Sequence, residues 1–594
     1  MKKRVADIIM EILVENGITD CFAVVGGGAM HLDNALALNT NIHKYFQHHE
    51  QACAMAAEAY ARVSGKMAAV CVTSGPGATN TLTGVMGAWQ DSLPMIVLSG
   101  QVRYEISVEK SGLPLRYRGT QEFHIVPVVK YMTKYAVMIT DPLSIRRELL
   151  KAIKISLDGR RGPVWLDIPL DMQQAIVEEK DLYLFDINEE TSKREEDFDK
   201  LKTAFTLLKS AKRPCILAGS GIISGNARSG FEKFVENIKL PIIGGAWVSD
   251  VFYTDHPRFY GLSGNIGPRM GNFILQNADV ILVLGNSLSF RQTGFLQEAF
   301  APNAKIIMVD ADEYEPLKPG LHLEMFLHMD LNDFFVSAKK IFTTLDADTH
   351  WLQYCDNLKS RFTPYEAIEK LDLKERVCSY YFWKKFEETA AADTIVALGN
   401  NSANSAKLQI GVQKQGQRVI TNYTCGSMGY DLPAAIGSAI AAKKEVICVT
   451  GDGSIMMNLQ ELQTIKHYDL PVKIIVFCND GYNAFRQTCK SFFDNQFIGC
   501  NADTGVSFPD FSKVSELFGF QYRKCENNLE VQEGLDWIFN NSGHLFLEVE
   551  QRLDDPVTPK VTSRLKDDGT FETPVLQDMY PFIDEEEYNE LMFW

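Results

Sequence analysis

The chain has 594 residues, a formal net charge of −17, and 46% hydrophobic and 23% charged residues. At about 150 residues per domain this length predicts three to four globular domains. The acidic balance, without a basic block, argues against nucleic acid and membranes as partners, and no apolar run reaches the roughly 18 residues that a membrane span needs. The 12 cysteines include no CxxC pair. We therefore expect a reducing compartment, the cytoplasm, and no structural zinc site.

Three blocks follow one another, and each alternates apolar strands with helical stretches. We place them at 1–185, 200–345 and 370–550, with a charged linker near 189–200 and a tail at 551–594. The expected elements, in chain order, are an amphipathic helix at 6–11, an apolar run at 162–169, strands at 215–218, 280–284 and 306–309, and strands at 395–398, 446–450 and 472–477. This alternation predicts three doubly wound α/β domains with parallel sheets.

Two short motifs follow neighbouring strands of the third block. Gly451-Asp452-Gly453-Ser454 comes after the strand at 446–450, and Asn479-Asp480-Gly481-Tyr482 comes after the strand at 472–477. The 27 positions from Asp452 to Asn479 fit one strand–turn–helix–strand unit, whose helix we expect at 454–468. In a parallel sheet both motifs fall at the carboxyl edge, where open α/β sheets bind ligands.

The two motifs offer hard oxygen ligands beside a helix N-terminus. Asp452 supplies a carboxylate, Asn479 an amide oxygen and Gly481 a main-chain carbonyl. Mg²⁺ accepts such ligands together with phosphate oxygens and water, and a helix N-terminus attracts a diphosphate. The alternative is an ordinary turn and an ordinary loop. Both motifs at this spacing favour a site that binds a metal ion and a diphosphate. We call Asp452, Asn479 and Gly481 the clamp.

Four further segments agree with the clamp. They are VGGG at 25–28, FQHHEQA at 46–52, TSGPGATN at 73–80, and GSMG at 426–429 with LPAA at 432–435. Together and in this order they resemble the acetohydroxyacid synthase (acetolactate synthase) branch of thiamine diphosphate enzymes, over nearly the whole chain. The resemblance implies a pyrimidine-binding, a central and a diphosphate- and metal-binding domain, in that order. It also implies an active site shared between two subunits of a homodimer or homotetramer.

The resemblance assigns roles to individual residues. Glu50 matches the glutamate that hydrogen-bonds the aminopyrimidine ring and shares a proton with it, and Gly27 and Gln121 are the other implied catalytic positions. A bland alternative for Glu50 is an acid at a helix start, stabilised by the helix dipole. The implied cofactor-binding positions are Gly26, Pro76, Asn80, Asn400, Asn401, Gly426, Met428, Gly453, Ser454 and Tyr482, with the clamp holding the metal.

Several of these positions have structural alternatives. Met428 would hold the two cofactor rings in a bent conformation, but methionine is also a common core filler. Pro76 and Asn80 would line the pyrimidine pocket, yet they also suit a tight turn and a helix cap. Asn400 and Asn401 match positions near the diphosphate, although their residue types differ from the common family pattern.

Departures from the family pattern bear on the substrate. Thr488 stands where the synthases carry a tryptophan that helps to select a second 2-oxo acid, which weakens an assignment to branched-chain amino acid synthesis. Cys478 replaces the first asparagine of the usual pair, while Asn479 keeps the ligand position. The segment SGQVR at 99–103 stands where simple decarboxylases carry a His-His pair, so carboligation is favoured over plain decarboxylation.

The central block leaves FAD open as a further cofactor. The turns at 219–221 and 285–287 end strands, as nucleotide sites require, and Arg291 matches an arginine that touches flavin. However, the acidic pair usual before that arginine is Ser289-Phe290 here. Turns with glycine also simply join strands to helices.

We therefore expect an enzyme that decarboxylates pyruvate or a related 2-oxo acid and transfers the acyl unit to a 2-oxo acid, an aldehyde or a keto-sugar. The alternatives are a non-oxidative decarboxylase or lyase, and a non-catalytic regulatory homologue that binds cofactor. In the tail, apolar residues within 575–594 predict packing on the folded body. This segment is either a lid over the cofactor or a structural strap.

Overall fold

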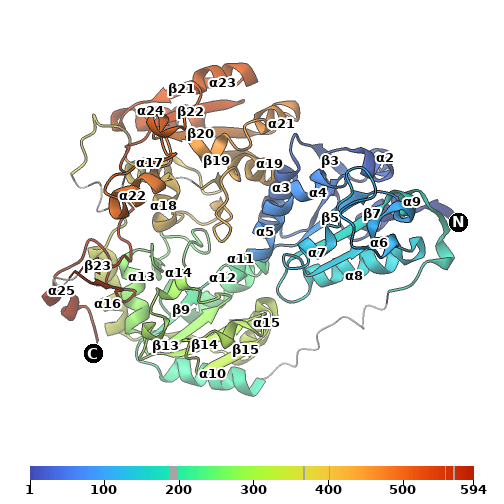
Figure 1. Ribbon diagram of the computed structural model, residues 1–594. Helices are drawn as coiled ribbons and strands as arrows, with labels where there is room; N and C mark the ends of the chain where they lie inside the picture. The colour runs from blue at the N-terminus through green and yellow to red at the C-terminus, as the bar shows by residue number, and fades with distance from the viewer. Residues whose placement is uncertain are drawn as a thin grey trace.

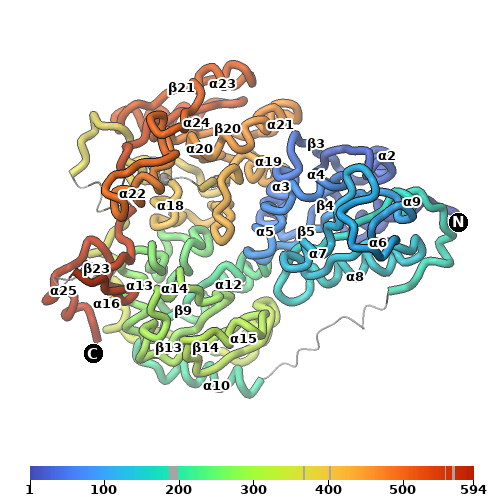
Figure 2. The backbone as a smooth tube through the Cα atoms, in the orientation of Figure 1, coloured from blue at the N-terminus to red at the C-terminus, as the bar shows by residue number. Residues whose placement is uncertain are grey.

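Three parallel six-stranded sheets, each covered by helices, form the computed structural model of this chain (Figures 1 and 2). It describes residues 1–185, 198–365, 368, 370–400, 402–555, 557–565 and 569–593. Every pair of neighbouring strands within these three sheets runs parallel. The predicted fold class, three doubly wound α/β domains, is confirmed.

The first sheet has the strand order β3-β2-β4-β5-β7-β6. Its strands are β2 (Asp20–Ala23), β3 (His43–Phe46), β4 (Ala68–Val72), β5 (Met95–Gln101), β6 (Tyr135–Met138) and β7 (Pro163–Pro169). Its helices are α1 (Val5–Glu15), α2 (Met30–Leu38), α3 (Glu50–Ser64), α4 (Pro76–Asn80), α5 (Leu82–Gln90), α6 (Val108–Ser111), α7 (Val126–Val129), α8 (Ile145–Leu157) and α9 (Leu170–Gln174). Strands β1 (Lys2–Arg4) and β8 (Ile176–Glu178) pair antiparallel beside this sheet.

The central sheet has the order β12-β11-β9-β13-β14-β15. Its strands are β9 (Pro214–Ala218), β11 (Ile242–Gly244), β12 (Phe259–Leu262), β13 (Val280–Leu284), β14 (Lys305–Asp310) and β15 (Met325–His328). Its helices are α10 (Phe198–Ser210), α11 (Gly221–Ser224), α12 (Arg228–Asn237), α13 (Arg269–Asn277), α14 (Phe290–Thr293), α15 (Leu331–Ile341) and α16 (Thr349–Arg361). The short strands β10 (Ile238–Lys239) and β16 (Leu345–Asp346) pair with each other.

The third sheet has the order β18-β17-β19-β20-β22-β21. Its strands are β17 (Ile395–Leu398), β18 (Arg418–Ile420), β19 (Val446–Gly451), β20 (Val472–Cys478), β21 (Gln521–Cys525) and β22 (Leu545–Glu550). Its helices are α17 (Ser379–Thr389), α18 (Ser402–Ile410), α19 (Asp431–Ala442), α20 (Asp452–Ile455), α21 (Glu461–His467), α22 (Asn483–Phe492), α23 (Phe511–Phe518) and α24 (Val531–Asn540).

One expected helix differs from the structure. The stretch 454–468 is not continuous but divides into α20 and α21. Between them lies Asn458, which is fully buried and whose amide donates to the carbonyl of Gly429 at 2.7 Å and to the side chain of Gln51 at 3.0 Å. These tertiary hydrogen bonds hold the intervening turn, and the apolar spacing alone does not reveal them.

The first and third domains meet along α3 and α19, which lie side by side in Figure 1. The contact is close because small residues face each other: a Cβ atom placed on Gly437 would lie 2.0 Å from the carbonyl oxygen of Ala56. Polar groups cross the same contact, where the hydroxyl of Tyr430 donates to the buried carboxylate of Glu58. Arg62 pairs with that carboxylate and, at 2.7 Å, with Asp91.

The tail follows the third sheet and returns to the central domain. It contains β23 (Arg564–Leu565), β24 (Phe571–Glu572) and α25 (Glu585–Glu590), and it lies beside α13 and α16 in Figure 1. Leu576, Met579 and Leu591 are buried in the core of the central domain. Arg269 donates to the carbonyl of Met579 at 3.0 Å, which anchors the segment to α13. The predicted packing of the tail on the body is confirmed for 575–593, and Trp594 lies outside the described residues.

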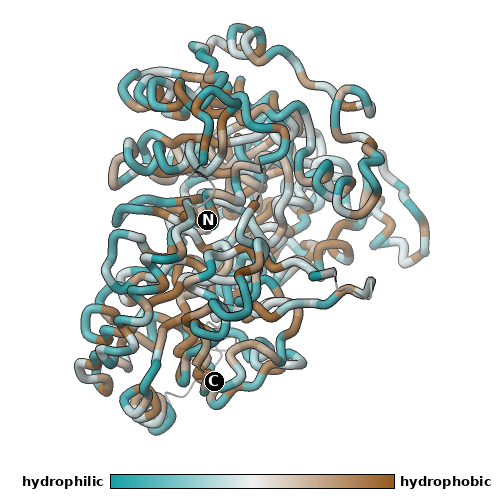
Figure 3. Tube along the Cα trace, turned by 90° about the vertical axis from the view of Figure 1, so that its left-hand side faces the viewer, coloured by the Kyte–Doolittle hydropathy of each residue, from teal (hydrophilic) through white to brown (hydrophobic). Residues whose placement is uncertain are grey.

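The hydrophobic stretches are short and interleaved with hydrophilic ones throughout the trace (Figure 3). Across the described parts of the chain, no helix is both long and apolar enough to cross a membrane.

The contact at Gly437 generates a first prediction. Gly437→Ala should destabilise the protein by about 1–3 kcal/mol, because the new methyl group overlaps the backbone of α3, which cannot move without disturbing the core. Unfolding by urea, followed by fluorescence, measures the change.

Gly87→Ala is the matched control. A Cβ there would lie 3.8 Å from Asn422 and Cys425, which is an ordinary contact between the same two domains. A Gly437→Ala protein as stable as the Gly87→Ala protein would contradict the tight contact.

Candidate active site

The clamp lies at the carboxyl edge of the third sheet. Strands β19 and β20 are parallel neighbours, with Gly451 opposite Phe477, so the loops that follow them emerge side by side. The Asp452 carboxylate accepts backbone N–H groups of Asn479 and Gly481, both at 3.1 Å, and of Gly453 at 2.8 Å. The predicted juxtaposition of the two motifs is therefore present.

The Asp452 carboxylate is buried among backbone donors. Burial raises the pKa of Asp452 to about 6, although the backbone donors around the carboxylate oppose this rise. Nowhere in the described ranges do three His, Cys, Asp or Glu side chains gather to hold a metal by themselves. A divalent cation here would combine the clamp oxygens with oxygens of a phosphate ligand.

An unpaired polar side chain lies next to the clamp in the sequence. Asn483, the first residue of α22, is buried, and neither atom of its side-chain amide has a hydrogen-bond partner among the described residues. A buried unpaired amide at the N-terminus of a ten-residue helix is suited to phosphate oxygens. Sequence reasoning missed Asn483, because only its burial and its lack of partners distinguish it from a helix-start asparagine.

The remaining positions of the third domain surround the clamp. A Cβ on Gly453 would lie 2.3 Å from the ring of Tyr482, so glycine is required there. The hydroxyl of Ser454 donates to Asp431 and accepts the N–H of Gly429 at 2.9 Å, so it braces the loop before α19.

Asn400 donates to the carbonyl of Gly426 at 2.5 Å, which links the loop after β17 to the loop that carries Met428. The side chain of Met428 is half-buried, as it would be if it lay against a ligand. Asn401 lies outside the described residues.

The first domain gathers the other predicted residues at its own carboxyl edge. Glu50 begins α3, and its carboxylate accepts the amide of Asn80 at 2.9 Å. A Cβ on Gly77 would lie 3.4 Å from that carboxylate, so the first turn of α4 lies close to Glu50. The hydrogen bond from Asn80 orients the Glu50 carboxylate at the start of α3.

Two loops extend this edge. Gly26 donates to Asp33 at 3.0 Å, and a Cβ on it would overlap Thr73, whereas Gly27 faces open space. Gln121 has a φ of 62°, and its carbonyl sits where a Cβ on Gly75 would be. The side chain of Gln121 is exposed. The structure therefore brings Glu50, Pro76, Asn80, Gly26, Gly27 and Gln121 to one edge.

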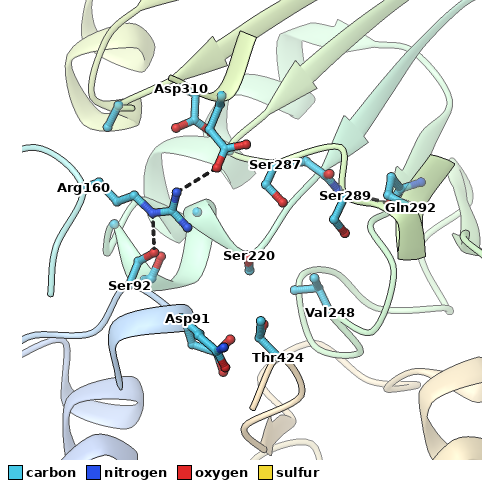
Figure 4. A pocket seen from close by; sticks show the side chains of 18 of the residues that line it. Asp91, Ser92, Arg160, Ser220, Val248, Ser287, Ser289, Gln292, Asp310 and Thr424 are labelled. Atoms are coloured by element: carbon cyan, nitrogen blue, oxygen red, sulfur yellow. Dashed lines mark hydrogen bonds and ion pairs between the residues drawn. The ribbon is translucent and has the colours of Figure 1, made fainter. Parts of the chain in front are cut away.

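A separate pocket of about 460 Å³ opens where the three domains meet (Figure 4). Its lining includes Arg160, which pairs with Asp312 at 2.9 Å and with Glu315 at 2.7 Å. Burial raises the pKa of Asp310, also in the lining, to about 6. The guanidinium of Arg291 lies 3.6 Å from the ring centroid of Trp247.

The glycine turns at this pocket have a structural explanation. A Cβ on Gly219 would lie 2.1 Å from the carbonyl of Gly285, and one on Gly221 would lie 2.8 Å from its Cα. The two turns therefore need glycine in order to pack against each other. Their glycines alone are no sign of a nucleotide.

The fold and the paired edge motifs define a three-domain α/β protein with a candidate diphosphate site at the edge of its third sheet. Family models of the thiamine pyrophosphate enzymes match three parts of the chain: the N-terminal TPP binding domain at 3–124, the central domain at 201–325 and the C-terminal TPP binding domain at 397–549. The chain therefore belongs to the thiamine pyrophosphate enzyme family.

Curated relatives place it within that family. The large subunit of acetolactate synthase isozyme 2 from Escherichia coli (strain K12) is 29% identical over 92% of this chain and 95% of its own length. A probable acetolactate synthase large subunit from Methanococcus aeolicus is 29% identical over 90% of both chains. The chloroplastic acetolactate synthase of Arabidopsis thaliana is 28% identical over 95% of this chain and 83% of its own. The resemblance found in the sequence is confirmed: the chain is an acetolactate synthase-like, thiamine diphosphate-dependent enzyme.

Proposed function

We propose that this enzyme is a carboligase that decarboxylates pyruvate or a close 2-oxo acid and transfers the acyl unit to an acceptor. The observation that carries the proposal is the clamp, with the unpaired amide of Asn483 beside it. The named activity of the relatives, acetolactate synthesis, supports a 2-oxo acid as donor. A second 2-oxo acid, an aldehyde and a keto-sugar are the acceptor classes to be tested.

Bound thiamine diphosphate supplies a carbon nucleophile that attacks the 2-oxo acid and accepts the electrons released with carbon dioxide. The protein binds and orients it. Asp452, Asn479 and Gly481 would hold Mg²⁺, while Gly453, Ser454 and Tyr482 shape the diphosphate loop. Gly426, Asn400 and Met428 would line the approach to the rings.

Glu50 is the proposed proton-exchanging group. Asn80 donates to its carboxylate at 2.9 Å and so fixes the orientation of the carboxyl group. The free acceptor positions of Glu50 can then meet a ring nitrogen and share a proton with it. Gly26 and Pro76 would bound the space for the aminopyrimidine, and Gly27 and Gln121 would face the reacting atoms.

We propose that Glu50 and the clamp work together across two subunits. Apolar side chains are exposed on both domains, among them Val25 (59%) and Leu113 (57%) on the first and Met457 (49%) and Phe485 (42%) on the third. A homodimer that pairs the first domain of one copy with the third domain of another would bury these groups.

FAD is retained as a secondary cofactor proposal. Arg161 and Arg291 in the pocket of Figure 4 would be the cations available to its phosphate groups, although Asp91, Asp310 and Asp330 add negative charge to the same lining. A cytoplasmic location also remains a proposal, supported by the 12 cysteines, all of which are free thiols.

The proposed reaction is tested with purified protein, thiamine diphosphate, Mg²⁺ and pyruvate, alone and with each acceptor class. We expect carbon dioxide release that a chelator abolishes, and a ligated product detected by mass spectrometry. Release of free aldehyde with every acceptor would establish the decarboxylase alternative. No turnover of any 2-oxo acid, with the cofactor bound, would establish the non-catalytic alternative.

Glu50→Gln should keep cofactor affinity and lose turnover by about 10²–10⁴-fold, because an amide still accepts a hydrogen bond but cannot exchange a proton. Calorimetry measures the affinity, and carbon dioxide release measures the rate. Glu15→Gln, an exposed acid at the end of α1, is the control that should behave as the parent. A rate of Glu50→Gln within twofold of the parent would exclude the proposed role.

The shared site is tested by mixing inactive Glu50→Gln and inactive Asp452→Ala proteins. Hybrid dimers contain one pair of intact edges, so exchange of subunits should restore up to about half of the activity per hybrid. Native mass spectrometry reports the exchange. Confirmed hybrids without recovered turnover would show that each chain builds its site alone.

A further inference from the structure

Gln551 begins the tail, two residues beyond the part matched by the third family model. Its backbone continues the line of β22, which runs parallel to β20 with Glu550 opposite Cys478. The N–H of Gln551 donates to the carbonyl of Cys478 at 2.8 Å. This register places Gln551 directly beside Asn479 of the clamp, and Gln551 is fully buried there.

A line of hydrogen bonds connects the tail to the clamp. The Asn479 Nδ2 donates to Gln551 Oε1 at 3.0 Å, and Gln551 Nε2 donates to Asp555 Oδ2 at 3.0 Å. Asp555 in turn accepts the backbone N–H of Ser379, the first residue of α17, at 2.8 Å. Asn479, Gln551, Asp555 and Ser379 are all at most 4% exposed.

The direction of these bonds decides which atom of Asn479 faces the metal. Asp555 Oδ2 accepts both the N–H of Ser379 and the amino group of Gln551, which turns the carbonyl oxygen of Gln551 towards Asn479. That oxygen only accepts, so it holds the amino group of Asn479 on its own side. The Oδ1 of Asn479 therefore points to the opposite side, where it accepts Arg486 Nη2 at 3.4 Å and where a magnesium ion would take it as an oxygen ligand.

Arg486 reinforces this geometry from α22. Its Nη2 donates to the main-chain carbonyl of Asn479 at 2.6 Å, to the side-chain Oδ1 of Asn479 at 3.4 Å, and to the carbonyl of Leu553 at 3.1 Å. The guanidinium thus ties the clamp loop to the same short segment, 551–555. The start of the tail is therefore built into the clamp, whereas 575–593 pack on the central domain.

We propose that Gln551 and Asp555 are positioning residues that present the Oδ1 of Asn479 to the divalent cation. The inference rests on the proposed role of Asn479 as a metal ligand. Such outer partners of a metal ligand typically contribute 10–100-fold to metal affinity.

Gln551→Leu removes the side-chain hydrogen bonds to Asn479 and Asp555 with little change in volume. We expect the Mg²⁺ concentration for half-maximal thiamine diphosphate binding, measured by quenching of tryptophan fluorescence, to rise about 10–100-fold. The melting temperature without cofactor reports any general loss of structure. Lys490→Met is the matched control, because Lys490 pairs with Asp554 in the same segment at 2.6 Å but, in the described part of the chain, forms no hydrogen bond or ion pair with Asn479, Gln551 or Asp555.

The double variant Gln551→Glu with Asp555→Asn tests the direction itself. The new carboxylate at 551 still accepts the amino groups of Asn479 and of the new asparagine at 555. The hydrogen bonds therefore keep their original direction, and Mg²⁺ affinity should return to within about threefold of the parent. Gln551→Glu alone places two carboxylates together and should bind Mg²⁺ as poorly as Gln551→Leu. This comparison decides the question even if the leucine variant does not fold.

Asn479→Ala distinguishes a failure of the metal site from a failure of the positioning role. If this variant binds Mg²⁺ as the parent does, the proposed metal site is wrong. The positioning role is overturned, and the metal site stands, if Asn479→Ala loses Mg²⁺ affinity while Gln551→Leu stays within twofold of the parent. Where the leucine variant does not fold, Gln551→Glu takes its place in this comparison. A double variant as weak as Gln551→Glu alone would also overturn it.

Discussion

The parallel pairing of β19 with β20 is the constraint on which the candidate site depends. Six residues of each strand are in register, from Val446 opposite Val472 to Gly451 opposite Phe477. Parallel strands end at the same edge, so the loops after them must share that edge. Asp452 joins the two loops, because its carboxylate accepts backbone N–H groups of Asn479 and Gly481 in one loop and of Gly453 in its own.

The other half of the site is set by a different contact. The first domain holds Glu50, Asn80 and the glycine loop at its own sheet edge. Within one chain, α3 is fixed against α19 by the close approach of Gly437 to Ala56 and by the buried group of Tyr430, Glu58 and Arg62. Exposed apolar side chains on both domains support the proposal of a second copy as the completing partner.

The tail serves two purposes that its sequence does not separate. Its start, 551–555, is hydrogen-bonded to Asn479 and Arg486 at the clamp. Its end, 575–593, is a strap whose apolar side chains complete the core of the central domain between α13 and α16. The described hydrogen-bond partners of the end segment, such as Arg269 and Asn277, lie in the central domain and support the strap over the lid.

The sequence by itself determined the fold class, the order of the three domains along the chain and the two clamp motifs. Buried parallel strands are recognisable as β-branched apolar runs, and the motifs are local. It also placed Glu50 at a helix start. Only the tertiary structure decided what depends on partners distant in the chain. Asn458 divides an expected helix by bonding to Gly429 and Gln51, and Gly219 and Gly221 pack against Gly285. Asn483 stands out only because its amide has no partner among the described residues. Gln551 stands out only because the pairing of β20 with β22 sets it beside Asn479. Hydrogen-bond satisfaction and close packing are properties of the folded chain, so no local pattern of residues encodes them.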